Sequence, residues 1–212
     1  MSYRVLAVLG DSIADGYWDE EGLGWFGRLQ AKIAKNYPYK FGFNNHAVSG
    51  DRCTDVFHRL NNEILSKEVD ILLVAVGVND LIRWGSTEAP TALSEGMQFE
   101  TWQRILLTAK RNISRIIVVG VLPVDESELP FSGAGGLPVW FLNKDIEAYN
   151  GRLTKWCDDA GVAFVDMYSQ WQKLNVPDYL HDDVHPNAKG HQLIAERAFD
   201  ELEKMGIFRE NI

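Results

Sequence analysis

The sequence VLAVLGDS, residues 5–12, places five consecutive apolar residues directly before a glycine, an aspartate and a serine. A short apolar run without alternation is typical of a strand buried on both faces of a parallel sheet. Gly10-Asp11-Ser12 is typical of a turn that caps the helix after such a strand. We therefore predict a buried strand over Val5–Leu9 that ends in a polar turn.

The same succession of apolar run, polar turn and helical pattern recurs along the chain. The further predicted strands are Phe41–Ala47, Ile71–Val76, Ile116–Leu122 and Val162–Val165. Helical patterns cover about Trp25–Lys35, Thr54–Leu65, Leu93–Arg111 and Val139–Ala160, and a last one runs from Pro186 to about Met205. Alternating strands and helices predict an α/β fold, a three-layer α/β/α sandwich around a five-stranded parallel sheet. Five strands suit a flavodoxin-like order.

Composition limits the class of protein. The chain has 212 residues, of which 46% are hydrophobic, enough for a sizeable core and unlike a disordered chain. No linker, repeat or low-complexity tract divides it, so we expect one domain over residues 1–212. The net charge of -9 argues against nucleic-acid binding and against docking on anionic lipid, both of which need a basic face.

The two cysteines, Cys53 and Cys157, are too few for a disulfide framework, and they have no metal-binding spacing. A reducing compartment is therefore expected. Met1–Leu9 holds one cation, Arg4, and an apolar run too short for an export signal. No apolar run approaches the ~20 residues that span a bilayer. These features predict a cytoplasmic protein without a membrane span.

Polar segments follow the predicted strands at the end where such sheets bind ligands. They are Gly10–Ser12, Asn45–Gly50, Gly77–Asp80 and, before the last helix, Asp182–Pro186. Each segment by itself could be only a turn or a helix cap. Together they contain the groups that acyl transfer requires.

A serine hydroxyl is a weak nucleophile until an imidazole accepts its proton, and the imidazole needs a carboxylate to hold its tautomer. The sequence offers Ser12 as nucleophile, His185 as base and Asp182 as the carboxylate. The oxyanion of the tetrahedral intermediate needs fixed donors. Candidate donors are the backbone N–H groups of Ser12 and Gly50 and the side-chain amide of Asn79.

Several alternatives remain open at this point. Asp183 competes with Asp182 as the partner of His185. The acidic and histidine residues between His181 and His191 could form a metal cluster, although they lack the usual zinc spacing. Three polar residues beside the candidate site are expected to support their loops rather than to transfer protons: Asp11, Asn45 and Asp80.

These segments give the chain a family resemblance. It resembles the SGNH hydrolases of the GDSL esterase/lipase superfamily, named after Ser, Gly, Asn and His residues in four sequence blocks. The matching blocks are Gly10-Asp11-Ser12 (followed by Ile13 where Leu is common), Asn45–Gly50, Gly77–Asp80 and Asp182-x-x-His185. The resemblance runs from residue 4 to about residue 205. It implies a three-layer α/β/α fold and hydrolysis of esters or thioesters without metal or cofactor. It also implies a triad of Ser12, Asp182 and His185 and an oxyanion hole of Ser12, Gly50 and Asn79.

The expected function is thus serine-dependent hydrolysis of a carboxylic ester through an acyl-enzyme on Ser12. A thioesterase or lysophospholipase with the same site, and a ligand-binding homologue without activity, are the alternatives. The expected partner is a small-molecule ester or thioester. No substrate-binding residue is assigned, but Pro123–Pro138 is long for a strand-to-helix loop and is expected to border the acyl or alcohol pocket. Tyr17, Trp18 and Arg83 lie near the candidate site in sequence.

Overall fold

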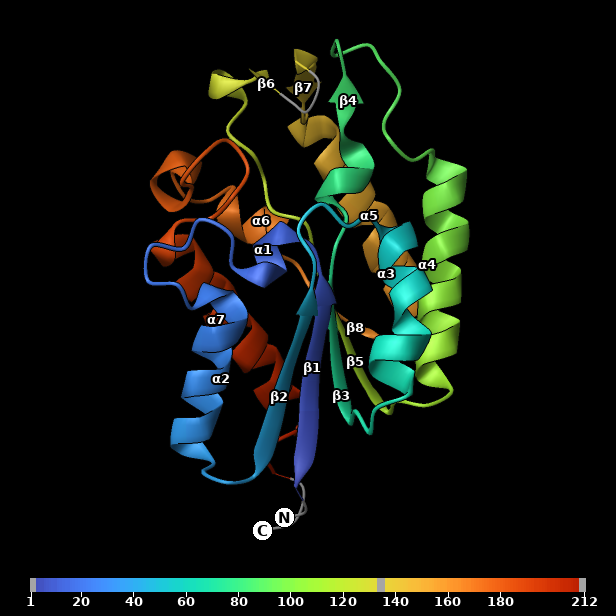
Figure 1. Cartoon of the computed structure of the whole chain (residues 1–212), viewed down its shortest axis with the longest axis vertical. Helices are drawn as coiled ribbons and strands as arrows, with labels where there is room; N and C mark the ends of the chain where they lie inside the picture. The colour runs from blue at the N-terminus through green and yellow to red at the C-terminus, as the bar shows by residue number, and fades with distance from the viewer. Residues whose placement is uncertain (1–2, 133–135, 210–212) are drawn as a thin grey trace.

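The fold is built on a five-stranded parallel sheet in the order β2-β1-β3-β5-β8, as the computed structural model in Figure 1 shows. The structure describes residues 3–132 and 136–209. The strands are β1 (Arg4–Gly10), β2 (Phe41–Ala47), β3 (Ile71–Ala75), β5 (Arg115–Val119) and β8 (Ala163–Val165). The predicted flavodoxin-like order is confirmed. Strand order reverses between β1 and β3, so the carboxyl ends of these two strands flank the expected ligand position.

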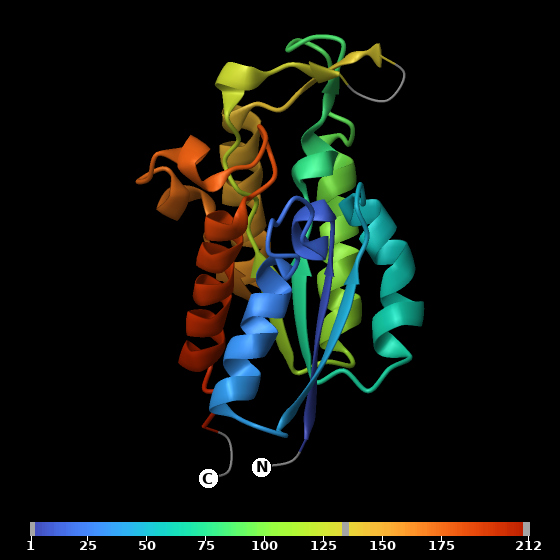
Figure 2. The same ribbon diagram turned by 60° about the vertical axis from the view of Figure 1, so that its left-hand side comes forward.

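Helices cover both faces of the sheet, which confirms the three-layer prediction. Figure 2 shows α2 (Gly24–Asn36) and α7 (Ala188–Lys204) side by side on one face. The other face is covered by α3 (Cys53–Leu60), α4 (Glu95–Lys110) and α5 (Asn143–Ala160). The shorter helical segments are α1 (Ser12–Asp15), α6 (Tyr168–Trp171), the π-helical turn η1 (Asn61–Leu65) and the 3₁₀ turns η2 (Val78–Leu81), η3 (Glu126–Glu128) and η5 (Val176–Tyr179).

The apolar run at the start of the chain supplies both layers of the core. Ala7 and Leu9 of β1 pack among the helices α3, α4 and α5, whereas Leu6 and Val8 pack against α2 and α7. All four side chains are fully buried. Because successive side chains of a strand point to opposite faces, a strand covered on both sides needs apolar residues at every position. This explains why the sequence run does not alternate.

A second, smaller sheet was not predicted. Its antiparallel order is β4 (Arg83–Trp84), β7 (Pro138–Trp140) and β6 (Phe131–Ser132). It lies above the carboxyl ends of the central strands (Figure 1). The helix predicted from Val139 therefore begins only at Asn143, because residues 138–140 pair with β4 and β6. The expected long loop Pro123–Pro138 contains β6; residues 133–135 of its glycine-rich run lie outside the described residues.

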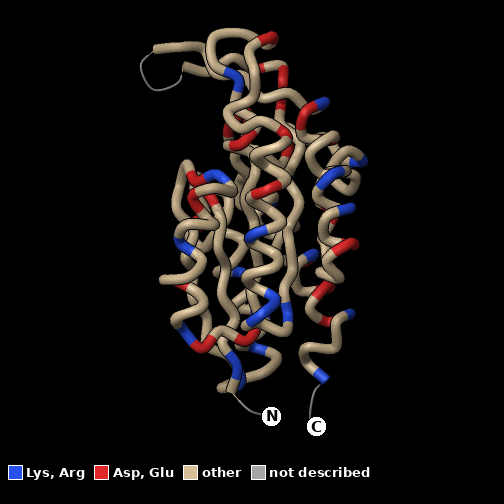
Figure 3. Tube along the Cα trace, turned by 90° about the vertical axis from the view of Figure 1, so that its right-hand side faces the viewer, with Lys and Arg blue, Asp and Glu red and all other residues tan. Residues whose placement is uncertain are grey.

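Charges of both signs are spread over the described part of the molecule. Figure 3 shows Lys and Arg positions interspersed with Asp and Glu positions along the trace. Within residues 3–132 and 136–209, no helix is both long and apolar enough to cross a membrane.

Candidate active site

Ser12 is the first residue of α1 and lies two residues after the end of β1, at the carboxyl end of the sheet. Asp11 begins the helix: its Oδ1 accepts a hydrogen bond from the Ile13 backbone N–H at 3.0 Å. Gly10 allows the end of β1 to lie close against β3, because a Cβ there would lie 2.4 Å from the Ala75 carbonyl oxygen. The Gly-Asp-Ser order thus has a local physical cause that leaves the Ser12 side chain at the strand end.

His185 reaches Ser12 from the loop before α7. Its Nε2 lies 3.0 Å from Ser12 Oγ, and its Nδ1 lies 2.8 Å from Asp182 Oδ2. A β-bridge between Leu180 and Pro186 closes this loop, and the His181 N–H donates to the His185 carbonyl at 2.8 Å. The loop geometry brings together three side chains that are separated by up to 173 residues of sequence.

Asp182, rather than Asp183, contacts His185. Asp182 Oδ1 accepts the backbone N–H groups of Val184 at 2.8 Å and His185 at 2.6 Å, while Oδ2 faces the ring. Partial burial opposes ionisation, but these bonds and the ring contact lower the pKa of Asp182 to about 2. Burial raises the pKa of Asp183, with added repulsion from Asp182 and Glu128. Asp182 is therefore a fixed carboxylate at neutral pH.

The second and third polar segments are tied to each other beside this site. Asn79 Nδ2 donates to the Asp51 carbonyl at 3.0 Å, and the Cys53 backbone N–H donates to Asp80 Oδ1 at 2.9 Å. One N–H of the Asn79 amide is thereby committed, which sets the direction of the other. Gly50, in the turn before Asp51, has φ +89°, and a Cβ there would meet no other atom. Its backbone conformation favours glycine and its surface stays open to an approaching group.

Buried polar contacts hold the Asn79 segment from below. The Tyr149 hydroxyl donates to Asp80 Oδ2 at 3.0 Å and accepts from Trp102 Nε1 at 2.7 Å. Gly77 packs on the same tyrosine, since a Cβ there would lie 2.6 Å from the Tyr149 ring. Burial raises the pKa of Asp80 to about 6 and that of Asp11 to about 7. Two buried carboxyl groups thus underlie the segments that carry Ser12 and Asn79.

The three polar residues expected to support their loops all accept backbone N–H groups. Asp11 and Asp80 accept backbone N–H groups as described above. Asn45 joins the second segment to α1: its Nδ2 donates to the Ala14 carbonyl at 3.2 Å and its Oδ1 accepts the Ala47 N–H at 2.9 Å.

Other residues near the candidate site in sequence have structural partners. Arg83 forms a two-bond ion pair with Asp145 of α5, at 2.6 and 2.9 Å. Cys53 is fully buried, and burial raises the pKa of its thiol. Among the residues that the structure describes, no group of three or more His, Cys, Asp or Glu side chains could hold a metal ion.

Sequence reasoning noted Tyr17 and Trp18 but missed what they contact. The Tyr17 ring lies 5.1 Å from the His185 ring, and the Trp18 ring stacks on His181 at 4.9 Å. Glu20 Oε2 accepts the Ala188 N–H at 2.8 Å, which ties the segment after α1 to the start of α7. The only sequence signal was two adjacent aromatic residues in a polar turn close to Ser12.

Comparison with known proteins shows the family of the chain. Residues 8–193 match the model of the GDSL-like Lipase/Acylhydrolase family. The chain is 25% identical to the protein YpmR of Bacillus subtilis (strain 168), over 97% of this chain and 84% of that one. It is 23% identical to an acetylxylan esterase of Geobacillus stearothermophilus, over 92% of this chain and 91% of the relative.

Solved structures show the same fold. A variant of an acetyl xylan esterase from Geobacillus stearothermophilus superposes with a TM-score of 0.76 at 20% identity, with 95% of each chain covered. The family match spans most of the chain and includes all four polar segments. The chain therefore belongs to the GDSL-like lipase/acylhydrolase family and is a carboxylic ester hydrolase.

Proposed function

We propose that the protein hydrolyses its ester through an acyl-enzyme on Ser12, with His185 and Asp182 completing a catalytic triad. The proposal rests on two hydrogen-bond contacts of the His185 ring. Ser12 Oγ lies 3.0 Å from His185 Nε2, and His185 Nδ1 lies 2.8 Å from Asp182 Oδ2. Both distances suit proton transfer and tautomer control.

In the first half-reaction Ser12 Oγ attacks the ester carbonyl carbon while His185 Nε2 takes the hydroxyl proton. The carbonyl oxygen becomes an oxyanion that accepts hydrogen bonds from the N–H groups of Ser12 and Gly50 and from the Asn79 amide. The protonated His185 then gives its proton to the alkoxide, and the alcohol leaves. The product of this step is an acyl-serine.

In the second half-reaction His185 takes a proton from water, and the water oxygen attacks the acyl-serine carbonyl. The intermediate collapses, Ser12 regains its proton and the carboxylic acid leaves. Asp182 stays ionised throughout, since its pKa is lowered to about 2. Its negative charge stabilises the imidazolium in both steps.

Three wider proposals accompany this mechanism. Residues 1–212 act as one hydrolase domain, because the sheet order interleaves early and late segments of the chain. The compartment is reducing, as in the cytoplasm, because Cys53 and Cys157 are both free and buried. The acyl group is short, with acetyl the first to test, because relatives are named acetylxylan esterases.

The test compares wild type and Ser12→Ala on p-nitrophenyl acetate, acetyl-CoA and a lysophospholipid. We expect wild-type turnover to be highest on the acetate ester and to vanish in Ser12→Ala, while circular dichroism shows an unchanged fold. A fluorophosphonate should label the wild type at Ser12. Turnover that survives in Ser12→Ala would overturn the mechanism, and binding without turnover in the wild type would indicate a non-catalytic homologue.

A further inference from the structure

We propose that Trp18, supported by Tyr17 and His181, forms a binding platform for the alcohol half of the substrate, and that this half is a neutral sugar ring. The proposal rests on the proposed function, since it requires an ester bond at Ser12. It adds the group that the ester carries on its leaving-group side.

The rings of the platform form a row of contacts that starts beside His185, the candidate base. The Tyr17 ring lies 5.1 Å from the His185 ring, and the Trp18 ring lies 4.9 Å from Tyr17. Trp18 in turn stacks nearly parallel on His181, at 4.9 Å and 16°. Tyr17 is 45% exposed and Trp18 is 49% exposed, so each residue keeps a large surface open to a ligand.

Trp18 occupies a backbone conformation that an aromatic residue rarely adopts. Its φ is +62°, in the left-handed region that glycine enters without penalty. In the described ranges, Tyr39 is the only other residue besides glycines with positive φ. A half-exposed tryptophan in this conformation, separated from His185 by the Tyr17 ring, is an outlier that motivates a functional hypothesis. Glycine at this position would satisfy the fold alone.

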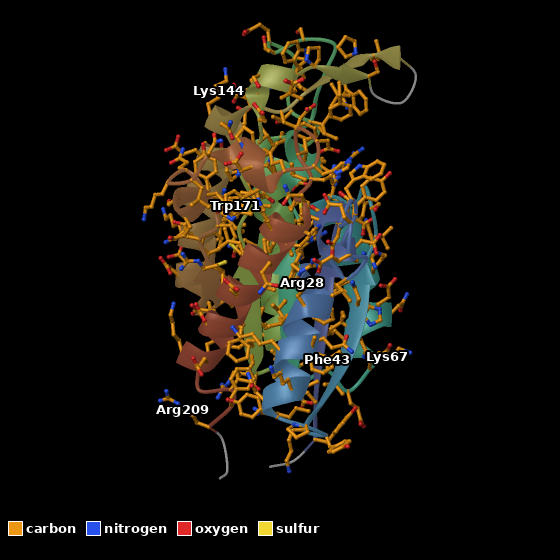
Figure 4. All side chains as sticks on the ribbon, turned by 90° about the vertical axis from the view of Figure 1, so that its left-hand side faces the viewer. Arg28, Phe43, Lys67, Lys144, Trp171 and Arg209 are labelled. Carbon is orange, nitrogen blue, oxygen red and sulfur yellow. The ribbon has the colours of Figure 1, made fainter. Side chains whose placement is uncertain are left out.

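The residues that follow Trp18 hold it rigidly. Asp19 is buried, accepts the Gly24 N–H at 2.7 Å and forms an ion pair with Arg28 of α2, which Figure 4 labels. Glu20 is bonded to the Ala188 N–H at the start of α7 and lies 3.7 Å from His181. The platform is therefore formed before substrate arrives, which limits the entropy lost on binding.

The surroundings of the platform select the chemistry of its ligand. An exposed indole face offers flat apolar contact, while the Glu20 carboxylate and the His181 imidazole beside it offer hydrogen-bonding groups. Binding sites for polar rings combine these two features. The nearby carboxylates Glu20 and Asp182 and the net charge of -9 oppose a phosphorylated or acidic ring. A neutral, hydroxyl-rich ring satisfies all of these conditions.

The experiment measures kcat/KM of wild type, Trp18→Leu and Trp18→Phe on three acetates: an acetylated methyl pyranoside, phenyl acetate and ethyl acetate. Trp18→Leu keeps the apolar character but removes the flat face. We expect it to lower kcat/KM about tenfold on the pyranoside, mainly through KM, and less than twofold on ethyl acetate. Trp18→Phe should recover most of the loss.

Tyr39→Leu is the matched control. Tyr39 has the same φ of +62° and is 96% exposed, but it precedes β2 and so lies at the opposite end of the sheet from Ser12. It should leave kcat/KM unchanged on all three esters.

Three results would overturn the proposal. An equal loss on the pyranoside and ethyl acetate would mean that Trp18 only holds the His185 loop. An equal loss on the pyranoside and phenyl acetate would assign the platform to flat aryl groups. No loss on any ester would exclude Trp18 from binding. Ser12→Ala keeps these results separate from the mechanism: turnover of ethyl acetate in that variant would refute the acyl-enzyme, whatever Trp18→Leu does.

Discussion

Replacing Asp182 with asparagine separates the two tasks of this side chain. Its Oδ1 holds the loop by accepting the N–H groups of Val184 and His185, and its Oδ2 faces His185 Nδ1. In Asp182→Asn the amide oxygen can keep both backbone bonds, so the amide nitrogen must face the ring. An N–H donor there forces the His185 proton onto Nε2, which can then no longer accept the proton of Ser12.

The two backbone bonds are retained, so we expect the free energy of unfolding to change by about 1 kcal/mol or less. Catalysis should change far more. Loss of the correct tautomer and of the charge beside the imidazolium should lower kcat/KM by about 10³- to 10⁴-fold, or ~4 to 5.5 kcal/mol of barrier. The assay is hydrolysis of p-nitrophenyl acetate at pH 7 to 8, with urea denaturation of the same samples.

Asp183→Asn is the matched control, because it makes the same exchange one residue further along the chain. Asp183 contributes its carbonyl to the Asp125 N–H, whereas the carboxylate that contacts the His185 ring is that of Asp182. Its kcat/KM should stay within about twofold of wild type. If Asp182→Asn kept more than a tenth of wild-type kcat/KM, or if Asp183→Asn lost as much, the assignment of Asp182 would be wrong.

Three further predictions concern the buried groups and the absence of a metal requirement. The folded-state pKa of Asp11, about 7, lies above its ordinary value of 3.8, so its contribution to stability is full below about pH 4 and is lost as the pH rises through 7. Asp11→Asn does not titrate, so its stability relative to wild type should rise by about 2 kcal/mol between pH 5 and pH 8 in urea denaturation; a constant difference would contradict the raised pKa. Tyr149→Phe removes the hydroxyl that bonds Trp102 Nε1 and Asp80 Oδ2 and should lower the free energy of unfolding by about 1 to 3 kcal/mol. Tyr168→Phe, whose hydroxyl is less buried and donates to the Asn143 carbonyl, should cost under about 1 kcal/mol. Incubation with EDTA should leave kcat/KM unchanged, and loss of activity that added metal restores would refute a serine mechanism without metal.

The central sheet and its helices could be predicted because local sequence patterns carry them. Val5–Leu9 and Ile71–Val76 are apolar at every position, as is typical of a strand covered on both faces. The sheet of β4, β7 and β6 could not be predicted in this way. Its strands have two or three residues, too few for a period, and they exist because distant segments such as 83–84 and 139–140 pair.

Some residues of the candidate site could likewise be predicted from local sequence, and one could not. Ser12, Gly50, Asn79 and His185 could be located because each follows a strand or precedes a helix whose pattern is local. Apart from the family resemblance, nothing in the sequence around Asp182 and Asp183 shows which of the two contacts His185. It depends on how the loop closed by Leu180 and Pro186 turns, and adjacent residues of a loop point in different directions.

By itself, the amino-acid sequence determined the class of fold, the strand-end position of the reactive groups and the acidic character of the chain. These follow from hydrophobic periodicity, from residue order and from composition, all of which are local or additive. Only the tertiary structure decided that Asp182 faces His185, that Asn79 is fixed by the Asp51 carbonyl, and that Trp18 stacks on His181. Such contacts depend on which way each side chain and loop turns in space, and the backbone path that sets these directions follows from the packing of the whole domain.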